Sequence, residues 1–409
     1  MNKLLLGFDL GTTSLLGRLW DETGQLLAEA ALNNPQQVFG ADVIQRMAAA
    51  QRGAGEPLQR QLIDGINTLF EQLLVISACR PEQIASAAVA ANPAISHFLA
   101  GQPIERILYP PHRPVYSGGN FLDSSQFGLT LPVPLYVLPL VSGYVGGDLL
   151  ALLLGSSPAA GPTLYVDLGT NAELALWDGA GWRVTSVAAG PAFEAGNLSC
   201  GMRYAPGAVA DVTLVKDRFA LTVAGGGVPK GLCGSGLFAL LSAALRAGLI
   251  TADGRIKAAD EIESNLSRYS VVDGAGNALQ LYRDARTCLR ITQADLRAFQ
   301  LAKGAVRAGV TCLLQRAGLS PEQLESVRIA GALGGALPTA ALKGVAMLPV
   351  IVLDRCRFLP AGVLDGLLTL LQHRTGRRSA ETLAAELNVY PLSGTPAFEK
   401  AFLSSLDFL

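Results

Sequence analysis

The sequence predicts an α/β protein with two similar lobes, and two observations lead to this prediction. The chain has 409 residues, and half of them are apolar. This length is greater than that of a typical domain with one hydrophobic core. It also contains nearly the same stretch twice, since Asp9-Leu10-Gly11-Thr12-Thr13 and Asp167-Leu168-Gly169-Thr170-Asn171 are each followed by an apolar run, a Trp-Asp pair and a glycine turn. Such internal similarity indicates a duplicated structural unit, so we expect one copy in each lobe.

Each copy has the pattern of a β-hairpin with a carboxylate and a glycine-hydroxyl turn at its bend. An aspartate that leaves a strand can hold hydrated magnesium, and the glycine lets backbone approach phosphate oxygens closely. Two such bends facing each other predict a clamp for a nucleotide polyphosphate and its metal ion. One bend alone would equally fit an ordinary hairpin turn, so the duplication carries the prediction.

The first half of the chain shows alternating strand and helix patterns. From the N-terminus we expect a hairpin or meander over 3–31, helices over 40–50 and 57–79, a buried strand over 85–91, a short helix over 94–100, an irregular excursion over 103–130, a strand over 135–141 and a helix over 147–154.

The second half begins with the second hairpin at Leu164. Thr292 followed by Asp295 resembles a capping box and predicts a long helix over 292–317. The other expected elements are short strands with glycine turns over 183–212, a helix over 236–247, small strands and loops over 251–290, a buried strand over 327–330 and helices beyond.

These patterns suggest three parts. The first lobe is expected over 1–155 and the second over 156–340, with a boundary near 156–162. A C-terminal helical segment over 341–409 is expected to pack back on the first lobe.

Two glycine-rich turns add to the nucleotide hypothesis. Ile329–Gly335 is a strand that opens into small residues, which suits a nucleoside packed on backbone, although a strand–helix packing turn fits it as well. Gly231–Gly236 precedes a helix whose N-terminus could take phosphate, and this signal is weak by itself.

Composition excludes several other classes. The charges are interspersed without a basic block, which argues against a nucleic-acid partner. Prolines and glycines divide the apolar stretch 131–155 below the length that spans a membrane. Asp9 cuts short the apolar start, so we expect no signal peptide and a cytoplasmic protein. The six cysteines form no C-x-x-C pair, which favours reduced thiols over an iron-sulfur cluster within the chain.

The order of these segments resembles the actin, sugar-kinase and heat-shock chaperone ATPase superfamily. The resemblance implies a two-lobed actin-like ATPase fold with ribonuclease H-like lobes, ATP and Mg²⁺ as ligands, and connecting helices near 143–154 and 342–348.

Several further strings are similar to the ATP-binding region of the reductive activators of corrinoid proteins, over essentially the whole chain. They are Asn34-Pro35-Gln36, Gly40 to Arg46, Gly143 to Asp148, Asp167 to Glu173, Ala189 to Glu194, Ser199 to Arg203, Lys230 to Leu237 and Gln300 to Ala305. This resemblance implies ATP-dependent reduction of a corrinoid protein or methyltransferase from Co(II) to Co(I).

Members of that family usually begin with a 2Fe–2S ferredoxin-like domain, whereas this sequence begins at the nucleotide-binding region. We therefore expect a separate low-potential electron donor such as a ferredoxin. The resemblance also allows a homodimer.

The expected site combines three roles. Asp9 and Asp167 are the proposed catalytic magnesium ligands, Asp148 is a third metal candidate that can equally cap its helix, and Glu173 is a general base or a structural salt-bridge partner. The expected nucleotide contacts are Gly11, Thr12, Thr13, Ser14, Gly169, Thr170, Asn171, Gly234, Ser235, Gly331, Ala332, Gly334 and Gly335.

Two other groups have plainer interpretations. Asp42 and Arg46 lie four residues apart and fit an ion pair on a helix, or alternatively a lobe–lobe or substrate role. Cys200 fits a buried thiol, or alternatively a contact near the cobalt or the partner surface.

Three rival functions stay open. A small-molecule kinase would need a catalytic aspartate beside a polar pocket, and a nucleotide-dependent chaperone or assembly factor would keep the clamp without reduction. An activator with a cluster bridged between two subunits would use Cys200 and Cys233.

Overall fold

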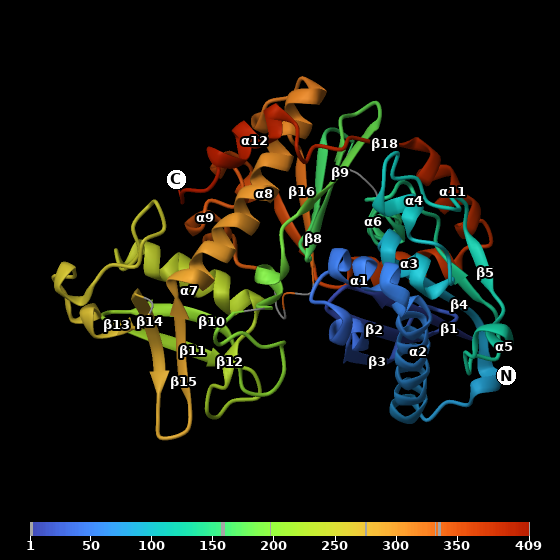
Figure 1. Ribbon diagram of the computed structural model, residues 1–409, viewed down its shortest axis with the longest axis horizontal. Helices are drawn as coiled ribbons and strands as arrows, with labels where there is room; N and C mark the ends of the chain where they lie inside the picture. Colours follow the sequence, from blue (N-terminus) through green and yellow to red (C-terminus); the bar gives the residue numbers. More distant parts are fainter. Residues whose placement is uncertain are drawn as a thin grey trace. The chain divides into compact units, whose positions relative to one another are not determined.

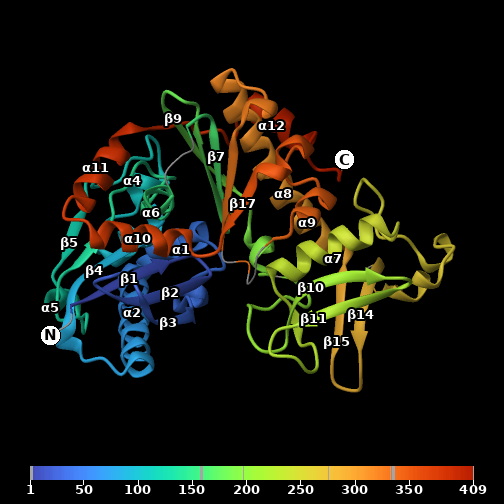
Figure 2. The same cartoon turned by 180° about the vertical axis from the view of Figure 1, so that it is seen from behind.

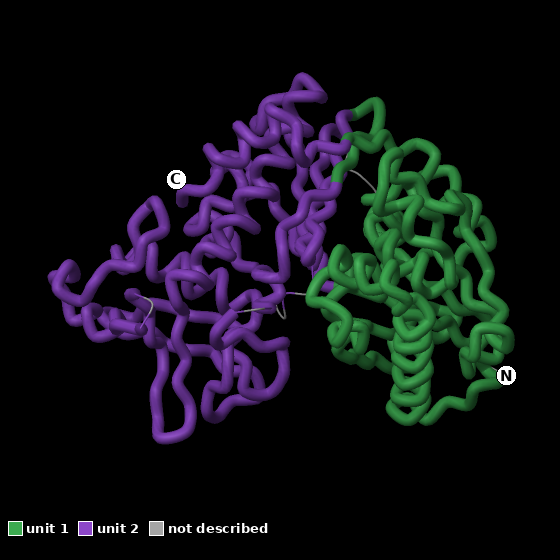
Figure 3. The backbone as a smooth tube through the Cα atoms, in the orientation of Figure 1, with its two compact units in different colours: residues 1–160, 179–185, 361–390 green, residues 161–178, 186–360, 391–409 purple. Residues whose placement is uncertain are grey.

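The chain divides into two units (Figure 3), and the computed structural model describes residues 3–156, 160–196, 198–274, 276–331, 333 and 337–408. Unit 1 comprises 1–160, 179–185 and 361–390, and unit 2 comprises 161–178, 186–360 and 391–409. Of the C-terminal segment 341–409, therefore, the part over 361–390 belongs to unit 1.

Unit 1 is built on one mixed sheet (Figure 1). Its strand order is β3-β2-β1-β4-β6-β5, where β1, β2 and β3 form an antiparallel meander and β4 and β6 run parallel to β1. The strands are β1 (Leu4–Leu10), β2 (Ser14–Asp21), β3 (Leu26–Asn33), β4 (Ile84–Ala91), β5 (Asn120–Leu122) and β6 (Leu135–Val137).

Helices cover both faces of this sheet because β1 is apolar on both sides. Leu6 and Phe8 belong to the core that also contains the apolar stripe of α2 (Gly55–Ser77), including Ile66. Gly7 lies between Leu6 and Phe8 on β1 and faces the opposite side of the sheet. A Cβ added to Gly7 would lie 3.4 Å from Leu367 of α10 (Gly362–Gln372). Figure 2 shows α10 on the side of the sheet opposite α2.

Two glycines let α6 (Gly147–Gly155) and α10 cross closely. A Cβ on Gly366 would lie 1.7 Å from the carbonyl oxygen of Ala151, and one on Gly155 would lie 2.7 Å from the Gly366 nitrogen. α10 thus packs closely on α6. The segment 342–348, expected as the second connecting helix, instead covers the end of α9 (Thr339–Gly344) and the loop after it in unit 2.

The other helices of unit 1 are short or lie near its ends. They are α1 (Val43–Ala49), α3 (Pro93–Leu99), α4 (Glu105–Leu108), α5 (Ser124–Phe127) and α11 (Gly376–Glu386). In the part of the chain that the structure describes, no helix is both long and apolar enough to cross a bilayer.

Unit 2 contains the second hairpin inside a sheet of order β17-β16-β7-β8. β16 (Ser326–Ala330) is parallel to its neighbours β7 (Thr163–Asp167) and β17 (Cys356–Leu359), and β8 (Asn171–Trp177) is antiparallel to β7. In unit 1, the first residues of β9 (Trp182–Ala188) pair with β18 (Leu387–Val389). Neither β17 nor β18 was expected, because the sequence after 340 shows mainly helical patterns.

Two long helices form the body of unit 2. α7 (Gly234–Arg246) follows the glycine-rich turn, and α8 (Gln293–Ala317) begins at the predicted N-cap Thr292 with the predicted capping box to Asp295. The remaining elements are β10 (Ala208–Val215), β11 (Arg218–Val223), β12 (Gly231–Leu232) and α12 (Pro396–Leu403).

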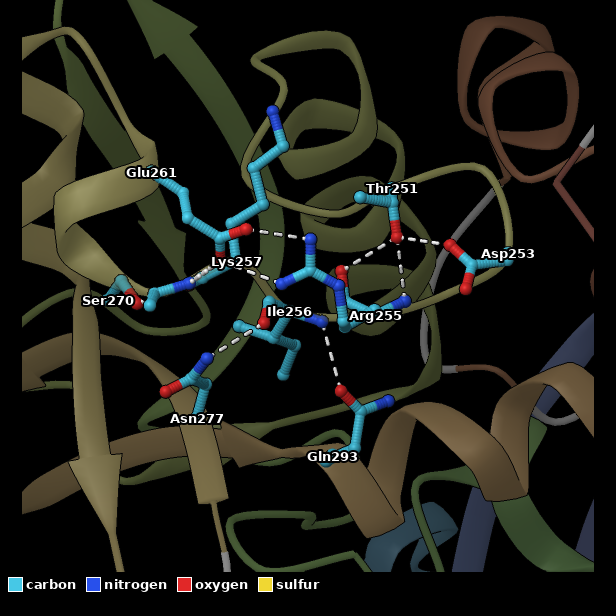
Figure 4. Close-up of polar contacts among 10 residues, drawn as sticks. Thr251, Asp253, Arg255, Ile256, Lys257, Glu261, Ser270, Asn277 and Gln293 are labelled. Atoms are coloured by element: carbon cyan, nitrogen blue, oxygen red, sulfur yellow. Dashed lines mark hydrogen bonds and ion pairs between the residues drawn. The ribbon is translucent and has the colours of Figure 1, made fainter.

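A small antiparallel sheet completes unit 2, with β13 (Ser270–Asp273), β14 (Gly276–Arg283) and β15 (Cys288–Thr292). Figure 4 shows how the loop before it is attached. Ile256 N–H donates to Gln293 Oε1 of α8 (2.9 Å), and Asn277 Nδ2 donates to Ile256 O (3.1 Å). A two-pronged ion pair joins Arg255 to Glu261, with N–O distances of 2.7 and 2.8 Å.

Candidate functional site

The first predicted phosphate turn, residues 11–14 of unit 1, is held by polar side chains. Gly11 N–H donates to the Ser14 carbonyl (2.8 Å) and closes the turn. Three consecutive carbonyls then accept side-chain hydrogen bonds, from Asn34 Nδ2 to Gly11 O (2.9 Å), from Arg46 Nη2 to Thr12 O (2.7 Å) and from Gln37 Nε2 to Thr13 O (3.1 Å).

This arrangement fits a phosphate-binding turn. In a trans peptide the C=O and N–H groups point in opposite directions. The N–H groups of Thr12, Thr13 and Ser14 therefore each face away from the side chain that holds the carbonyl of the same peptide. Successive backbone N–H groups directed to one side form a typical anion-binding concavity.

The other predicted residues of unit 1 gather at the same edge of the sheet. β1 and β4 are parallel and end together, and Asn92, directly after β4, donates from Nδ2 to Thr12 Oγ1 (3.3 Å). α6 also begins at this edge. Its N-cap Gly146 lies beside the end of β4, since an added Cβ on Gly146 would be 2.5 Å from the Ala91 carbonyl oxygen. Asp148 in the first turn of α6 and Asp9 near the end of β1 thus share one edge.

Arg46 contacts the first predicted phosphate turn, although its spacing from Asp42 favours an ion pair on the helix. Its side chain is fully buried, and it donates to carbonyl oxygens of Thr12 and Gly40 and to the side-chain oxygen of Gln36. Asp42 instead caps α1 by accepting from the Gln45 N–H (2.8 Å). The expected Asp42–Arg46 ion pair is therefore replaced by two separate functions, helix capping and support of the turn.

The second turn, in unit 2, carries a pair of carboxylates. Asp167 at the end of β7 lies opposite Glu173 of β8 in the hairpin register. Directly opposed residues of an antiparallel pair project from the same face, with Cβ atoms about 5 Å apart. In the first hairpin Asp9 is opposite Leu16, so the paired carboxylates distinguish the second hairpin. Glu173 is only 3% exposed, which suits either a general base shielded from water or a structural role.

Glu194 contacts this turn, a role that the string Ala189 to Glu194 does not reveal in the sequence. Its carboxylate accepts from the Thr170 N–H (3.1 Å) and lies 3.5 Å from Thr170 Oγ1. The Thr170 carbonyl in turn accepts from the Gly190 N–H (2.8 Å). A phosphate that binds at the Thr170 amide would have to displace Glu194, because both would use the same donor. Gly169 lies beside this carboxylate and Asn171 begins β8.

The glycine-rich start of α7 is tightly packed. The Ser235 hydroxyl donates to Ala210 O (2.8 Å) and its N–H donates to Leu333 O (2.9 Å). A Cβ on Gly234 would lie 2.1 Å from the carbonyl oxygen of Phe193, so this glycine permits close backbone packing. These contacts give Gly234 and Ser235 structural roles. Their contact with a nucleotide stays a prediction.

The predicted adenosine turn begins beside the second phosphate turn. Gly331 has φ +138°, and a Cβ there would lie 2.4 Å from the Leu168 carbonyl oxygen. Leu168 N–H donates to Ala330 O (2.9 Å), which joins the ends of β7 and β16. Ala332, Gly334 and Gly335 lie outside the described residues.

Among the described residues, no three or more His, Cys, Asp or Glu side chains form a group that could hold a metal ion. Magnesium commonly takes only one or two protein carboxylates and fills its shell with water and phosphate oxygens. Asp9 and Asp167 suit this type of binding by residue type.

Cys200 has the environment of an unreactive thiol. Burial, reinforced by the charge of Asp295, raises the pKa of Cys200 to about 12. Its segment is fixed to α8, since Asp295 Oδ1 accepts from Ser199 N–H (3.0 Å).

Comparison with known proteins yields matches along both parts of the chain. Residues 161–409 match the family model described as the C-terminal domain of RACo, the ASKHA domain, and residues 4–157 match the RACo middle region. Over 363 residues the chain is 30% identical to the corrinoid activation enzyme RamQ of Eubacterium limosum, covering 85% of this chain and 60% of that protein.

Two further proteins match most of this chain. The [Co(II) methylated amine-specific corrinoid protein] reductase of Methanosarcina barkeri is 25% identical over 364 residues, covering 80% of this chain and 63% of the reductase. A solved reductive activator for a corrinoid, iron-sulfur protein matches with a TM-score of 0.92 and 27% identity, covering 99% of this chain and 66% of that one. The chain thus spans less than two thirds of the length of each relative.

Proposed function

Since this chain belongs to the RACo family, we propose that it is an ATP-hydrolysing activator that drives the reduction of a corrinoid protein from Co(II) to Co(I). The match to the ASKHA domain and to the solved activator confirms the predicted actin-like ATPase fold. The observation that carries the functional proposal is that relatives matched along most of this chain are named for corrinoid activation or Co(II) corrinoid reduction.

The turns supply the proposed nucleotide chemistry. The amides of residues 11–14 bind phosphate oxygens, and Gly169, Thr170 and Asn171 do so in unit 2. In unit 1 Asp9 would hold magnesium, with Asp148 as a further candidate, and in unit 2 Asp167 would do so. When bound, the ion neutralises charge on the phosphate groups. Glu173 orients the attacking water and accepts its proton.

The reductive step needs two inputs. One electron passes from a low-potential donor, such as a separate ferredoxin, to Co(II), which becomes Co(I) while the donor is oxidised by one electron. Hydrolysis of ATP to ADP and phosphate supplies the free energy for this uphill transfer. We propose that nucleotide binding changes the conformation of the activator and thereby its affinity for the corrinoid protein.

The test is an anaerobic spectrum of a Co(II) corrinoid protein mixed with this protein and a chemical reductant, recorded with and without Mg-ATP. A chemical reductant makes the result independent of the natural electron donor. Asp167→Asn is the test variant, and Asp260→Asn, an exposed carboxylate of the same unit, is its matched control.

Co(I) formation that requires Mg-ATP, persists in Asp260→Asn and is lost in Asp167→Asn would support the proposal. ATP hydrolysis without Co(I) formation, with any corrinoid protein offered, would favour the chaperone or kinase alternatives. A non-hydrolysable ATP analogue that supports full, repeated Co(I) formation would overturn the role of hydrolysis.

A further inference from the structure

The most unusual charge in unit 1 is the guanidinium of Arg46. The side chain has no exposed surface, yet within the described residues its hydrogen bonds go only to neutral acceptors. Fully buried charged groups in proteins are ordinarily paired with an opposite charge. Arg46 therefore keeps a positive charge inside the protein that no carboxylate of the described residues contacts directly.

The environment of Arg46 still leaves it protonated near neutral pH. Burial lowers the pKa of Arg46 to about 10, and the charge of Asp42 at longer range acts in the opposite direction. A pKa of this size leaves the guanidinium charged at pH 7.

The position of this charge is specific. Nη2 donates to the Thr12 carbonyl at 2.7 Å, a short, charge-assisted bond, and Nε donates to Gly40 O at 3.0 Å. Gln36, also fully buried, accepts from Arg46 Nη1 (3.4 Å) and donates to the Leu58 carbonyl of α2 (2.9 Å). A chain of hydrogen bonds thus connects α2 with the predicted phosphate turn.

The bond to Thr12 acts on the peptide that joins Thr12 to Thr13. A cationic donor at the carbonyl oxygen polarises the amide and makes its N–H a stronger donor. That N–H points away from Arg46, because C=O and N–H are antiparallel in a trans peptide. The charge lies behind the turn and the polarised N–H lies on its other side.

We propose that Arg46 is a positioning residue of the nucleotide site, which fixes the turn of residues 11–14 and supplies the positive charge that phosphate groups neutralise on binding. This inference rests on the proposed nucleotide function and deepens it. It explains why a buried cation is retained without a carboxylate: the compensating anion is the polyphosphate of the ligand.

The inference predicts that loss of Arg46 lowers the affinity for the phosphate groups of ATP and does not change the affinity for adenosine. Arg46→Met removes both the charge and the bonds, so ATP affinity should fall about 10- to 100-fold. Adenosine affinity should stay within about twofold, since adenosine carries no phosphate. Arg46→Lys keeps the charge but not the planar set of donors, so it should restore part of the ATP affinity. Arg60→Met, which removes an exposed arginine of α2, is the matched control and should leave both affinities unchanged.

The experiment is calorimetric titration of wild type and the three variants with ATP and with adenosine, read as the ratio of the two affinities. A partly unfolded variant lowers both affinities equally and leaves the ratio unchanged, so the ratio isolates the phosphate effect. If Arg46→Met does not fold, Arg46→Lys carries the test through the same ratio.

A reduced ratio in Arg46→Met with partial recovery in Arg46→Lys would support the inference. An unchanged ratio in the folded variants would overturn it and assign Arg46 a purely structural role. Wild-type protein that binds no ATP would instead overturn the nucleotide function itself, so the two failures are distinguishable.

Discussion

Replacing Asp295 by alanine should loosen both the start of α8 and the segment that carries Cys200. Asp295 is 5% exposed, and its two oxygens accept three hydrogen bonds. Oδ1 accepts from Ser199 N–H (3.0 Å), and Oδ2 accepts from the N–H and the hydroxyl of Thr292 (both 2.8 Å).

The expected loss follows from these contacts. A hydrogen bond to a charged group contributes about 1.5–3 kcal/mol, and a helix cap contributes about 1 kcal/mol. One charged bond to Ser199 and one capping interaction therefore give a loss of about 2.5–4 kcal/mol in Asp295→Ala. Asp295→Asn keeps one oxygen acceptor and should lose about half as much.

The first assay is urea unfolding followed by circular dichroism, with Asp260→Ala as the exposed control in the same unit. The second is the rate at which Cys200 reacts with a thiol reagent at pH 8, in a Cys288→Ser background that removes an exposed thiol. Removing Asp295 takes away one cause of the raised Cys200 pKa and frees its segment, so this rate should rise. A stability loss below about 0.5 kcal/mol, the usual range for exposed surface substitutions, would refute the reasoning.

Three other predictions follow from the same structure. Glu173→Gln should lower ATP turnover about 100-fold or more with unchanged ATP affinity, measured by single-turnover hydrolysis and calorimetry, and full turnover would leave Glu173 a structural residue. Lys303 is buried and donates to the Asp407 carbonyl, and burial lowers its pKa to about 7 from 10.5. Between these two pKa values Lys303 is protonated in the unfolded chain and neutral in the folded chain, so the free energy of unfolding should rise with pH by up to about 1.4 kcal/mol per pH unit. Lys303→Met should flatten this slope in melting curves recorded at pH 7–9.5. Gly366→Ala should destabilise unit 1 by about 2 kcal/mol or more, because the added Cβ would clash with the Ala151 carbonyl. Gly55→Ala is the control and should not destabilise the unit, since nothing lies within 4 Å of a Cβ there. Equal melting temperatures of the two variants would contradict the packing of Gly366 on Ala151.

Local patterns predicted much of this protein. The two hairpins, the capped start of α8 and the strands that open into glycine turns all depend on residues close together in the chain. Such features follow from side-chain periodicity, capping and backbone freedom, which a single sequence displays directly. The same is true of the candidate residues at the two bends, which the structure places at the ends of β1 and β7.

Only the tertiary structure decided which distant groups meet. Arg46 fits an ion pair with Asp42 by its spacing, yet it supports Thr12, which lies 34 residues earlier. Glu194 reaches the turn at Thr170, and α10 returns from the end of the chain to pack on α6 in unit 1. β17 and β18 are too short to give a clear alternating pattern and exist through pairing with neighbours. Sequence periodicity records which face of an element is apolar, but the choice among buried partners depends on shape and on satisfying polar groups, which are properties of the folded chain.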